Sequence, residues 1–278
     1  MVSQNPGPME LDKRPIGVFD SGIGGLTVLR DLLRDFPNEN FIYLGDTARL
    51  PYGSKSAETV RHYSVQNMKY LVSQDVKALV VACNTASTQI FESHYEQRRV
   101  YNVIDPGSKL AAQKTENKKV GVLATRATIK SGCYAQKIKS HDESIEVFSQ
   151  SCPLFVPLAE EGWYEDPITN LIAFRYLQNL KAADIDTVVL GCTHYPLLKL
   201  AIARVFGNHV QLIDSGEAVS MQNKQDFDNQ KMARNSDKNE SNLLIALTDK
   251  SEHFEALASK LLKDVTAATI QFETVSVI

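Results

Sequence analysis

The chain has 278 residues, enough for one large α/β domain or two smaller ones, and 43% of them are hydrophobic, as in ordinary globular proteins. A formal net charge of −3 gives no electrostatic basis for binding nucleic acid or an anionic membrane surface. No apolar run approaches the length of a membrane span, and the loose polar segment 1–14 lacks the apolar core of a signal peptide. We therefore expect a cytoplasmic protein that binds neither nucleic acid nor a membrane.

The predicted elements alternate between short apolar strands and amphipathic helices. The predicted strands are 16–19, 41–44, 79–82, 100–104, 119–125, 145–148, 188–190, 210–213, 243–248 and 269–278. The predicted helices are 26–33, 56–73, 86–99, 128–139, 168–177, 197–206 and 254–262, with a loop and short helix in the proline-broken stretch 152–163. This alternation predicts an α/β fold built on mainly parallel sheets.

The turn at Asp105-Pro106-Gly107 marks the expected crossing from one α/β unit into a second. The second unit is complete at Ile213, so we assign residues 106–215 to the second domain, and residues 1–105 with 216–278 to the first. The segment 222–241 is rich in Asn, Asp, Lys and Gln, and we expect a solvated loop or a helix end there.

Two cysteines follow apolar strands in nearly the same setting. Cys83 ends one strand and precedes Asn84-Thr85, while Cys192 ends another and precedes Thr193-His194. Open α/β sheets bind ligands at such strand ends, and a helix start lowers the pKa of a thiol from about 8.5. A single buried cysteine is more often a small hydrophobic residue, which is our interpretation of the other two, Cys133 and Cys152. The repeated setting instead favours two reactive thiols that face one pocket.

Two thiols on opposite sides of a substrate predict a specific reaction. One thiolate removes a proton from carbon while the other thiol returns a proton on the opposite face, which inverts a stereocentre without a cofactor or a metal. The adjacent carboxylate of the substrate then needs hydrogen-bond donors and exclusion of water. The glycine turn Asp20–Gly25 offers backbone donors of this kind, whereas its glycine spacing fits a nucleotide-binding loop only in part.

Three further side chains are candidates for proton transfer. Asp20 is a candidate partner for a substrate amine or a catalytic thiol, with a turn-capping role as the alternative. His194 is better interpreted as the acid–base partner of Cys192 than as a metal ligand, because the other histidines lack ligand spacing. Glu160 lies in an apolar, proline-rich stretch that would suit a proton relay, although a surface glutamate fits the pattern equally well.

Taken together, four motifs in sequence order resemble the glutamate racemases of the aspartate/glutamate racemase superfamily. They are Phe19-Asp20-Ser21-Gly22-Ile23-Gly24-Gly25, Asp46 with Pro51-Tyr52-Gly53, Ala82-Cys83-Asn84-Thr85-Ala86, and Gly191-Cys192-Thr193-His194-Tyr195-Pro196-Leu197-Leu198. The resemblance implies two pseudo-symmetric α/β domains with the active site in the cleft between them. It also implies cofactor-independent interconversion of L- and D-glutamate, which supplies D-glutamate for peptidoglycan.

The resemblance assigns roles to residues of this chain. Cys83 is implied to act on D-glutamate with help from Asp20, and Cys192 on L-glutamate with help from His194 and Glu160. The implied substrate contacts are Asp20, Ser21, Tyr52, Gly53, Asn84, Thr85, Thr125, Thr128, Thr193 and His194. The resemblance also implies two possible partners: a second copy of the chain in a homodimer, and a cell-wall precursor as an activator. The sequence decides neither point. The segment 222–241 departs from the family pattern and is interpreted as an insertion.

Two alternatives stay open. An aspartate racemase of the same superfamily would share these motifs, and one methylene of difference between substrates is worth only about 1–3 kcal/mol. A non-catalytic amino-acid or nucleotide binding module on the same fold is the second alternative, since one fold hosts many functions. Two retained thiols argue against it, because binding does not require them.

Overall fold

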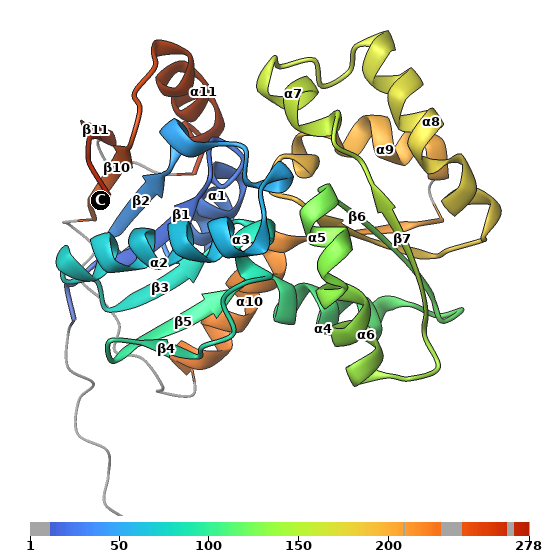
Figure 1. Cartoon of the computed structure of the whole chain (residues 1–278), viewed down its shortest axis with the longest axis horizontal. Coiled ribbons are helices and arrows are strands. Elements are labelled where there is room, and N and C mark those ends of the chain that lie inside the picture. Colours follow the sequence, from blue (N-terminus) through green and yellow to red (C-terminus); the bar gives the residue numbers. More distant parts are fainter. Residues whose placement is uncertain (1–11, 208, 229–240, 266–269, 278) are drawn as a thin grey trace, which may run out of the picture.

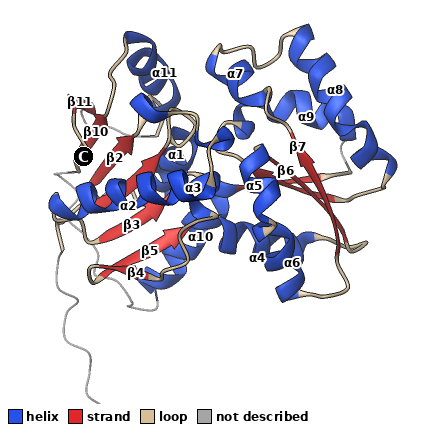
Figure 2. Ribbon diagram, in the orientation of Figure 1, coloured by secondary structure: helices blue, strands red, loops and turns tan. Residues whose placement is uncertain are grey.

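The computed structural model describes residues 12–207, 209–228, 241–265 and 270–277. These residues form two lobes, each with its own sheet, which lie side by side in Figures 1 and 2. The sheet of the first lobe has seven strands in the order β11-β10-β2-β1-β3-β5-β4, and that of the second has four in the order β7-β6-β8-β9. Helices cover both faces of each sheet, so four buried apolar clusters form, two to a lobe.

The first lobe contains both ends of the described chain. Its strands are β1 (Ile16–Asp20), β2 (Phe41–Gly45), β3 (Ala78–Val81), β4 (His94–Tyr95), β5 (Arg98–Asn102), β10 (Leu243–Leu247) and β11 (Ile270–Thr274). Its helices are α1 (Leu26–Asp35), α2 (Ala57–Ser73), α3 (Asn84–Ser87) and α11 (Glu252–Leu262), with 3-10 turns η1 (Thr47–Arg49) and η2 (Tyr52–Ser54). Within the described strands, β4 with β5 is the one antiparallel pair.

The second lobe is built on an entirely parallel sheet. Its strands are β6 (Lys119–Ala124), β7 (Glu146–Ser151), β8 (Thr187–Gly191) and β9 (Gln211–Asp214). Its helices are α4 (Ile104–Lys114), α5 (Arg126–Ser131), α6 (Cys133–His141), α7 (Phe155–Glu160), α8 (Pro167–Ala182) and α9 (Lys199–Phe206), with the 3-10 turn η3 (Tyr195–Leu198). Helix α10 (Ser215–Asp228) follows β9 and packs against α1 and α4, so it contacts both lobes.

The two sheets repeat one strand order. In the first lobe β1 lies between β2 and β3, with β5 beyond β3; in the second, β6 lies between β7 and β8, with β9 beyond β8. Cys83 and Cys192 therefore follow equivalent strands, β3 and β8. The predicted α/β fold with mainly parallel sheets and two related units is confirmed. The predicted domain boundaries stay a prediction, although β10 and β11 do join the first sheet.

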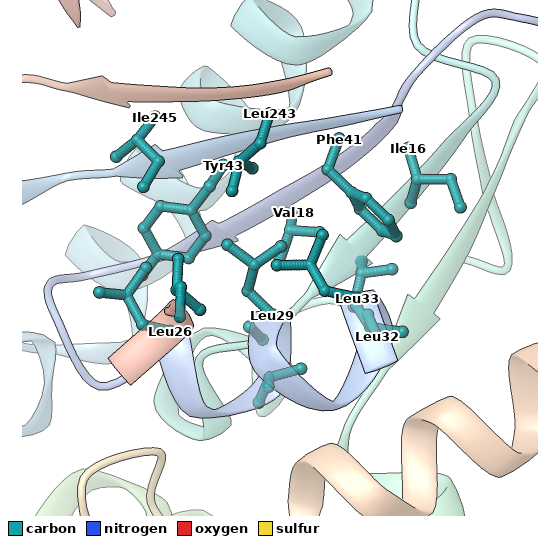
Figure 3. Close-up of a cluster of buried hydrophobic side chains, with 14 of the residues drawn as sticks. Ile16, Val18, Leu26, Leu29, Leu32, Leu33, Phe41, Tyr43, Leu243 and Ile245 are labelled. Atoms are coloured by element: carbon teal, nitrogen blue, oxygen red, sulfur yellow. The ribbon is translucent and has the colours of Figure 1, made fainter. Parts of the chain in front are cut away.

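Figure 3 shows the packing that holds β1 in place. The leucines of α1 recur at helical spacing and cover β1, β2 and β10, with all of these side chains buried. The buried residues drawn there include Ile16, Val18, Leu26, Leu29, Leu32, Leu33, Phe41, Tyr43, Leu243 and Ile245. Burial of each such side chain contributes about 1.5–3 kcal/mol to the stability of the fold. This packing holds β1 in place, and with it Asp20 at the end of the strand.

The prediction of a helix at 86–99 was wrong. Helix α3 ends at Ser87, and the chain then forms the hairpin of β4 and β5. Glu96 and Gln97 both take positive φ angles, 43° and 65°, which suit a tight turn and not a helix. The predicted strand 100–104 correspondingly begins earlier and ends at Asn102, whose side chain accepts hydrogen bonds from the backbone N–H groups of the next helix start.

Helix α4 was not predicted, because Asp105-Pro106-Gly107 resembled a turn. Pro106 lies in the first helical turn, where a missing N–H costs no hydrogen bond. The single helix predicted at 128–139 is two helices, α5 and α6, separated by Gly132 in the left-handed region at φ 69°.

The first part of the polar segment is helical. Helix α10 extends to Asp228, and Asn223 and Asp226 within it are buried, so the helix is packed at these two positions. Residues 229–240, like the N-terminal residues 1–11, lie outside the described part of the chain. Among the helices of the described ranges, none is both long and apolar enough to cross a membrane.

Candidate active site

One cavity of about 270 Å³ brings the two repeated motifs together. From the first lobe it is lined by Ser21, Leu50, Pro51, Tyr52, Gly53, Ser54, Cys83, Asn84 and Thr85. From the second lobe it is lined by Thr125, Arg126, Pro153, Val156, Pro157, Glu160, Cys192, Thr193 and His194. Two larger cavities, about 490 and 340 Å³, border α4 and α6, but neither contains Cys83 or Cys192. The chemistry points to the smaller one.

The predicted site residues line this cavity with two exceptions, Asp20 and Thr128, which lie behind its wall. The Asp20 carboxylate accepts a hydrogen bond from the Thr193 hydroxyl at 3.3 Å. The Thr128 hydroxyl bonds to those of Thr85 at 3.1 Å and Thr125 at 3.0 Å. Both residues thus support side chains that face the cavity. The contacts of Asp20 with Thr193 and of Thr128 with Thr85 join the two lobes, and the contact of Thr128 with Thr125 lies within the second lobe.

Cys83 is a buried thiol at the end of β3. Its sulfur accepts a hydrogen bond from the backbone N–H of Ala86 at 3.4 Å, and it lies 3.9 Å from the Ser21 hydroxyl. Burial raises the pKa of Cys83 well above its ordinary value, and the nearby Asp20 charge adds to this. The expected lowering by a helix start was wrong here, because α3 has only four residues and one N–H does not offset the desolvation.

Asp20 takes up the donors that the glycine turn was expected to offer to a substrate. Its carboxylate accepts the backbone N–H groups of Gly22 at 3.0 Å and Gly25 at 3.1 Å. Burial raises the pKa of Asp20, while the charge of His194 and these N–H groups act in the opposite direction. Of the turn residues, Ser21 is the one that reaches the cavity.

Cys192 has a different partner from Cys83. Its sulfur lies 3.8 Å from Nδ1 of His194, and Nε2 of the same ring lies 3.2 Å from the Glu160 carboxylate. Burial alone would lower the pKa of His194, but its hydrogen bonds to Cys192 and Glu160 outweigh this and raise it to about 10. The ring is therefore an imidazolium at neutral pH, placed to stabilise negative charge on the Cys192 sulfur.

The raised pKa of His194 predicts how stability depends on pH. An unfolded histidine titrates near pH 6.5, so its proton stabilises the fold fully below that pH, and this stability is lost as pH rises through about 10. In urea unfolding from pH 6 to 10.5, we expect the free energy of unfolding to fall with pH. The His194 proton should contribute up to about 1.4 kcal/mol per pH unit to this fall, and His194→Gln should lack that contribution. The exposed His62 provides the control, His62→Gln. Equal slopes for both variants would contradict the assignment.

Tyr52 and Gly53 are held at the cavity by a separate network. The Tyr52 hydroxyl donates to the buried carboxylate of Asp46 and accepts from the Asn67 amide at 3.0 Å. Arg49 binds both oxygens of the same carboxylate at 2.8 Å. Gly53 lies against the other lobe so closely that an added Cβ would be 2.7 Å from the Thr125 side chain. A glycine is needed there for the lobes to meet.

Several residues that line the cavity were not predicted from the sequence, above all Arg126. Within the described lining it is the one lysine or arginine, and its side chain is exposed at the cavity. Its position directly after the predicted strand 119–125 was the available signal, since ligands bind at strand ends. The apolar side of the cavity, formed by Pro153, Val156 and Pro157, came from a stretch that was interpreted only as loop and short helix.

Two α/β lobes of one topology, with a cysteine from each lining a shared cavity, define a racemase-type architecture. The chain belongs to the Asp/Glu/Hydantoin racemase family, whose sequence model matches residues 25–222. The resemblance that the four motifs indicated is thus confirmed.

Individual relatives agree with this family. A glutamate racemase of Geobacter metallireducens is 50% identical over 206 residues, which cover 73% of this chain and 76% of that protein. The glutamate racemase of Francisella tularensis, solved in complex with D-glutamate, is 39% identical with a TM-score of 0.86, covering 96% of this chain and 99% of that one. The Escherichia coli glutamate racemase, solved with L-glutamate and the activator UDP-MurNAc-Ala, is 28% identical with a TM-score of 0.78, covering 95% and 99%.

Proposed function

We propose that this protein is a glutamate racemase that uses Cys83 and Cys192 as its two proton-transfer groups. The observation that carries the proposal is the shared cavity, to which each lobe contributes one buried thiol with its own polar partners. The glutamate racemases to which the chain is similar support glutamate as the substrate.

In the proposed reaction the thiolate of Cys192, next to the imidazolium of His194, removes the α-proton of L-glutamate. The electron pair of the broken C–H bond stays on the substrate and spreads into its α-carboxylate. Cys83 then donates its thiol proton to the opposite face, which gives D-glutamate and leaves Cys83 as the thiolate. The reverse reaction exchanges the two roles. No group is oxidised or reduced, so the proposed chemistry needs no redox cofactor.

The environment of each sulfur suits its role in this scheme. The raised pKa of Cys83 keeps its proton in place until a carbanion is there to accept it. The Glu160 carboxylate forms a hydrogen bond with His194, and the Asp20 carboxylate accepts one from Thr193. These contacts fix His194 and Thr193 on the side of the cavity where Cys192 acts. Candidate substrate contacts, besides these, are Ser21, Tyr52, Gly53, Asn84, Thr85 and Thr125, with Thr128 behind them.

The cellular role is part of the same proposal. We expect D-glutamate from this reaction to supply peptidoglycan synthesis in the cytoplasm. The activator in the Escherichia coli relative supports testing a cell-wall precursor of that type, and a homodimer is the further partner to be tested.

The test is racemisation followed by polarimetry, starting from either enantiomer of glutamate and of aspartate, with no cofactor added. We expect both glutamate enantiomers to reach an equal mixture, with and without UDP-MurNAc-Ala to measure activation. We expect aspartate to react about 10–200-fold more slowly, because one methylene is worth that much discrimination. Faster turnover of aspartate than of glutamate would mean that aspartate is the substrate. Tight binding of glutamate without turnover would favour a non-catalytic binding module.

A further inference from the structure

At the cavity, the Asn84 amide combines an acceptor that is already in use with a donor that is not. It is 2% exposed and lines the cavity. Its carbonyl oxygen, Oδ1, accepts from the Tyr134 hydroxyl and lies 3.2 Å from the Ser215 hydroxyl. Its amide nitrogen, Nδ2, has no hydrogen-bond partner among the residues that the structure describes. A buried N–H without a partner costs about 1–3 kcal/mol, so a ligand that accepts from it would recover that energy.

The orientation of the Asn84 amide follows from the chemistry of its neighbours. Tyr134 is 2% exposed, and burial raises its pKa, so its hydroxyl keeps its proton over the working pH range. That proton needs an acceptor, and Oδ1 of Asn84 provides it. Ser215 is a weaker constraint, because its single proton is shared with the Leu190 carbonyl, also at 3.2 Å. The donor Nδ2 is thereby left for the cavity.

The three residues come from separate parts of the fold. Asn84 begins α3 in the first lobe, Tyr134 lies in α6 of the second, and Ser215 begins α10, which contacts both lobes. The Tyr134 ring packs against the end of β8, where an added Cβ on Gly191 would lie 3.0 Å from it. The residue after Gly191 is Cys192, so this ring lies directly beside one of the two proposed catalytic cysteines.

We propose that Tyr134 and Ser215 are positioning residues that fix the Asn84 amide so that Nδ2 donates to a carboxylate of the bound substrate. The inference rests on the proposed function, since glutamate is the acceptor. Because negative charge on the α-carboxylate increases as the α-proton leaves, the donor stabilises the transition state more than bound glutamate. The loss should therefore appear in kcat as well as in KM.

The experiment is a double-mutant cycle on the full chain, with kcat and KM for L-glutamate measured for wild type, Tyr134→Phe, Asn84→Ala and the double variant. We expect kcat/KM to fall about 10–100-fold in Asn84→Ala, the range for a hydrogen bond to a charged group, and somewhat less in Tyr134→Phe. Adding Tyr134→Phe to Asn84→Ala should change kcat/KM by less than about twofold, because the tyrosine acts through the amide. Ser215→Ala should show the smallest loss.

The control is Tyr101→Phe, which removes the hydroxyl of another buried tyrosine, one that interacts with Asp226 away from the cavity. Its kcat/KM should stay within about twofold of wild type, and thermal unfolding should show that all variants are folded. Equal fold-losses from Tyr134→Phe in both backgrounds would mean a merely structural role and overturn the inference. Wild-type kinetics in both Tyr134→Phe and Ser215→Ala would overturn it as well. A wild type that does not turn over glutamate would instead overturn the proposed function, and the inference with it.

Discussion

Replacing either Cys83 or Cys192 with serine is expected to lower kcat/KM for racemisation of glutamate by about 10²–10⁴-fold, the usual contribution of a positioned acid or base. A serine hydroxyl occupies nearly the same place but is far less acidic than a thiol. It therefore neither forms the anion that removes the α-proton nor gives up a proton readily to the carbanion. Both thiols lie in the same cavity, so each variant should lose the reaction in both directions.

Exchange of the α-proton in deuterated water separates the two roles. Enantiomers have equal free energies, so kcat/KM must fall equally in both directions, and turnover alone does not show which base was lost. Cys83→Ser keeps the proposed base for L-glutamate and should exchange the α-proton of that enantiomer alone, as followed by NMR. Cys192→Ser should exchange only D-glutamate. If either variant exchanged both enantiomers at one rate, the one-sided assignment of the thiols would be wrong.

The electrostatics around Cys83 predict a pH dependence for the Cys192→Ser variant, in which Cys83 is the remaining base. Burial and the Asp20 charge raise the pKa of Cys83, so its thiolate fraction is small at neutral pH and increases as the pH rises. Exchange of D-glutamate by Cys192→Ser, which depends on the Cys83 thiolate, should therefore be slow at pH 7 and should accelerate towards higher pH. Cys133→Ser is the matched control, because this partly exposed cysteine does not line the cavity.

The sequence predicted the parts of the site that depend on local pattern. Each cysteine ends an apolar run, and parallel strands place their ends at one edge of a sheet, so Cys83 and Cys192 could be assigned to ligand-binding positions. Repetition of the setting then suggested a shared pocket. The spacing of Cys192 and His194 likewise identified a contact that the structure places at 3.8 Å.

The remaining parts depend on contacts between distant segments. Tyr134 and Ser215 lie 50 and 131 residues from Asn84, so no local spacing marks them as its partners. The raised pKa of Cys83 depends on three-dimensional burial, which the short polar sequence after it does not reveal. The helix predicted at 86–99 failed for a related reason, since the turn and the sheet contacts of the hairpin outweigh helical propensity.

The second prediction with a large effect concerns Gly24, where the lobes meet beside the Cys192 side of the cavity. An added Cβ there would lie 2.4 Å from the Thr193 hydroxyl and 2.5 Å from Nδ1 of His194. Neither neighbour can yield freely: the Thr27 hydroxyl holds the Thr193 carbonyl at 2.9 Å, and His194 lies between Cys192 and Glu160. Gly24→Ala should therefore displace the imidazolium from the sulfur and lower kcat/KM by about 10²-fold, as a misplacement of about 1 Å does.

The same glycine turn supplies the comparison that isolates this steric effect. An added Cβ on Gly22 would meet only a side-chain carbon of Leu50 at 3.5 Å, an ordinary contact, and the alanine would keep the N–H that Asp20 accepts. The fold-loss in kcat/KM of Gly22→Ala should then be less than about a tenth of that of Gly24→Ala. The two variants should have similar unfolding midpoints. Because both substitutions change the turn backbone alike, a large difference in kcat/KM is attributable to the displaced Thr193–His194 pair. Equal losses in the two variants would instead assign the effect to the turn itself and remove the argument for close contact between the lobes at Gly24.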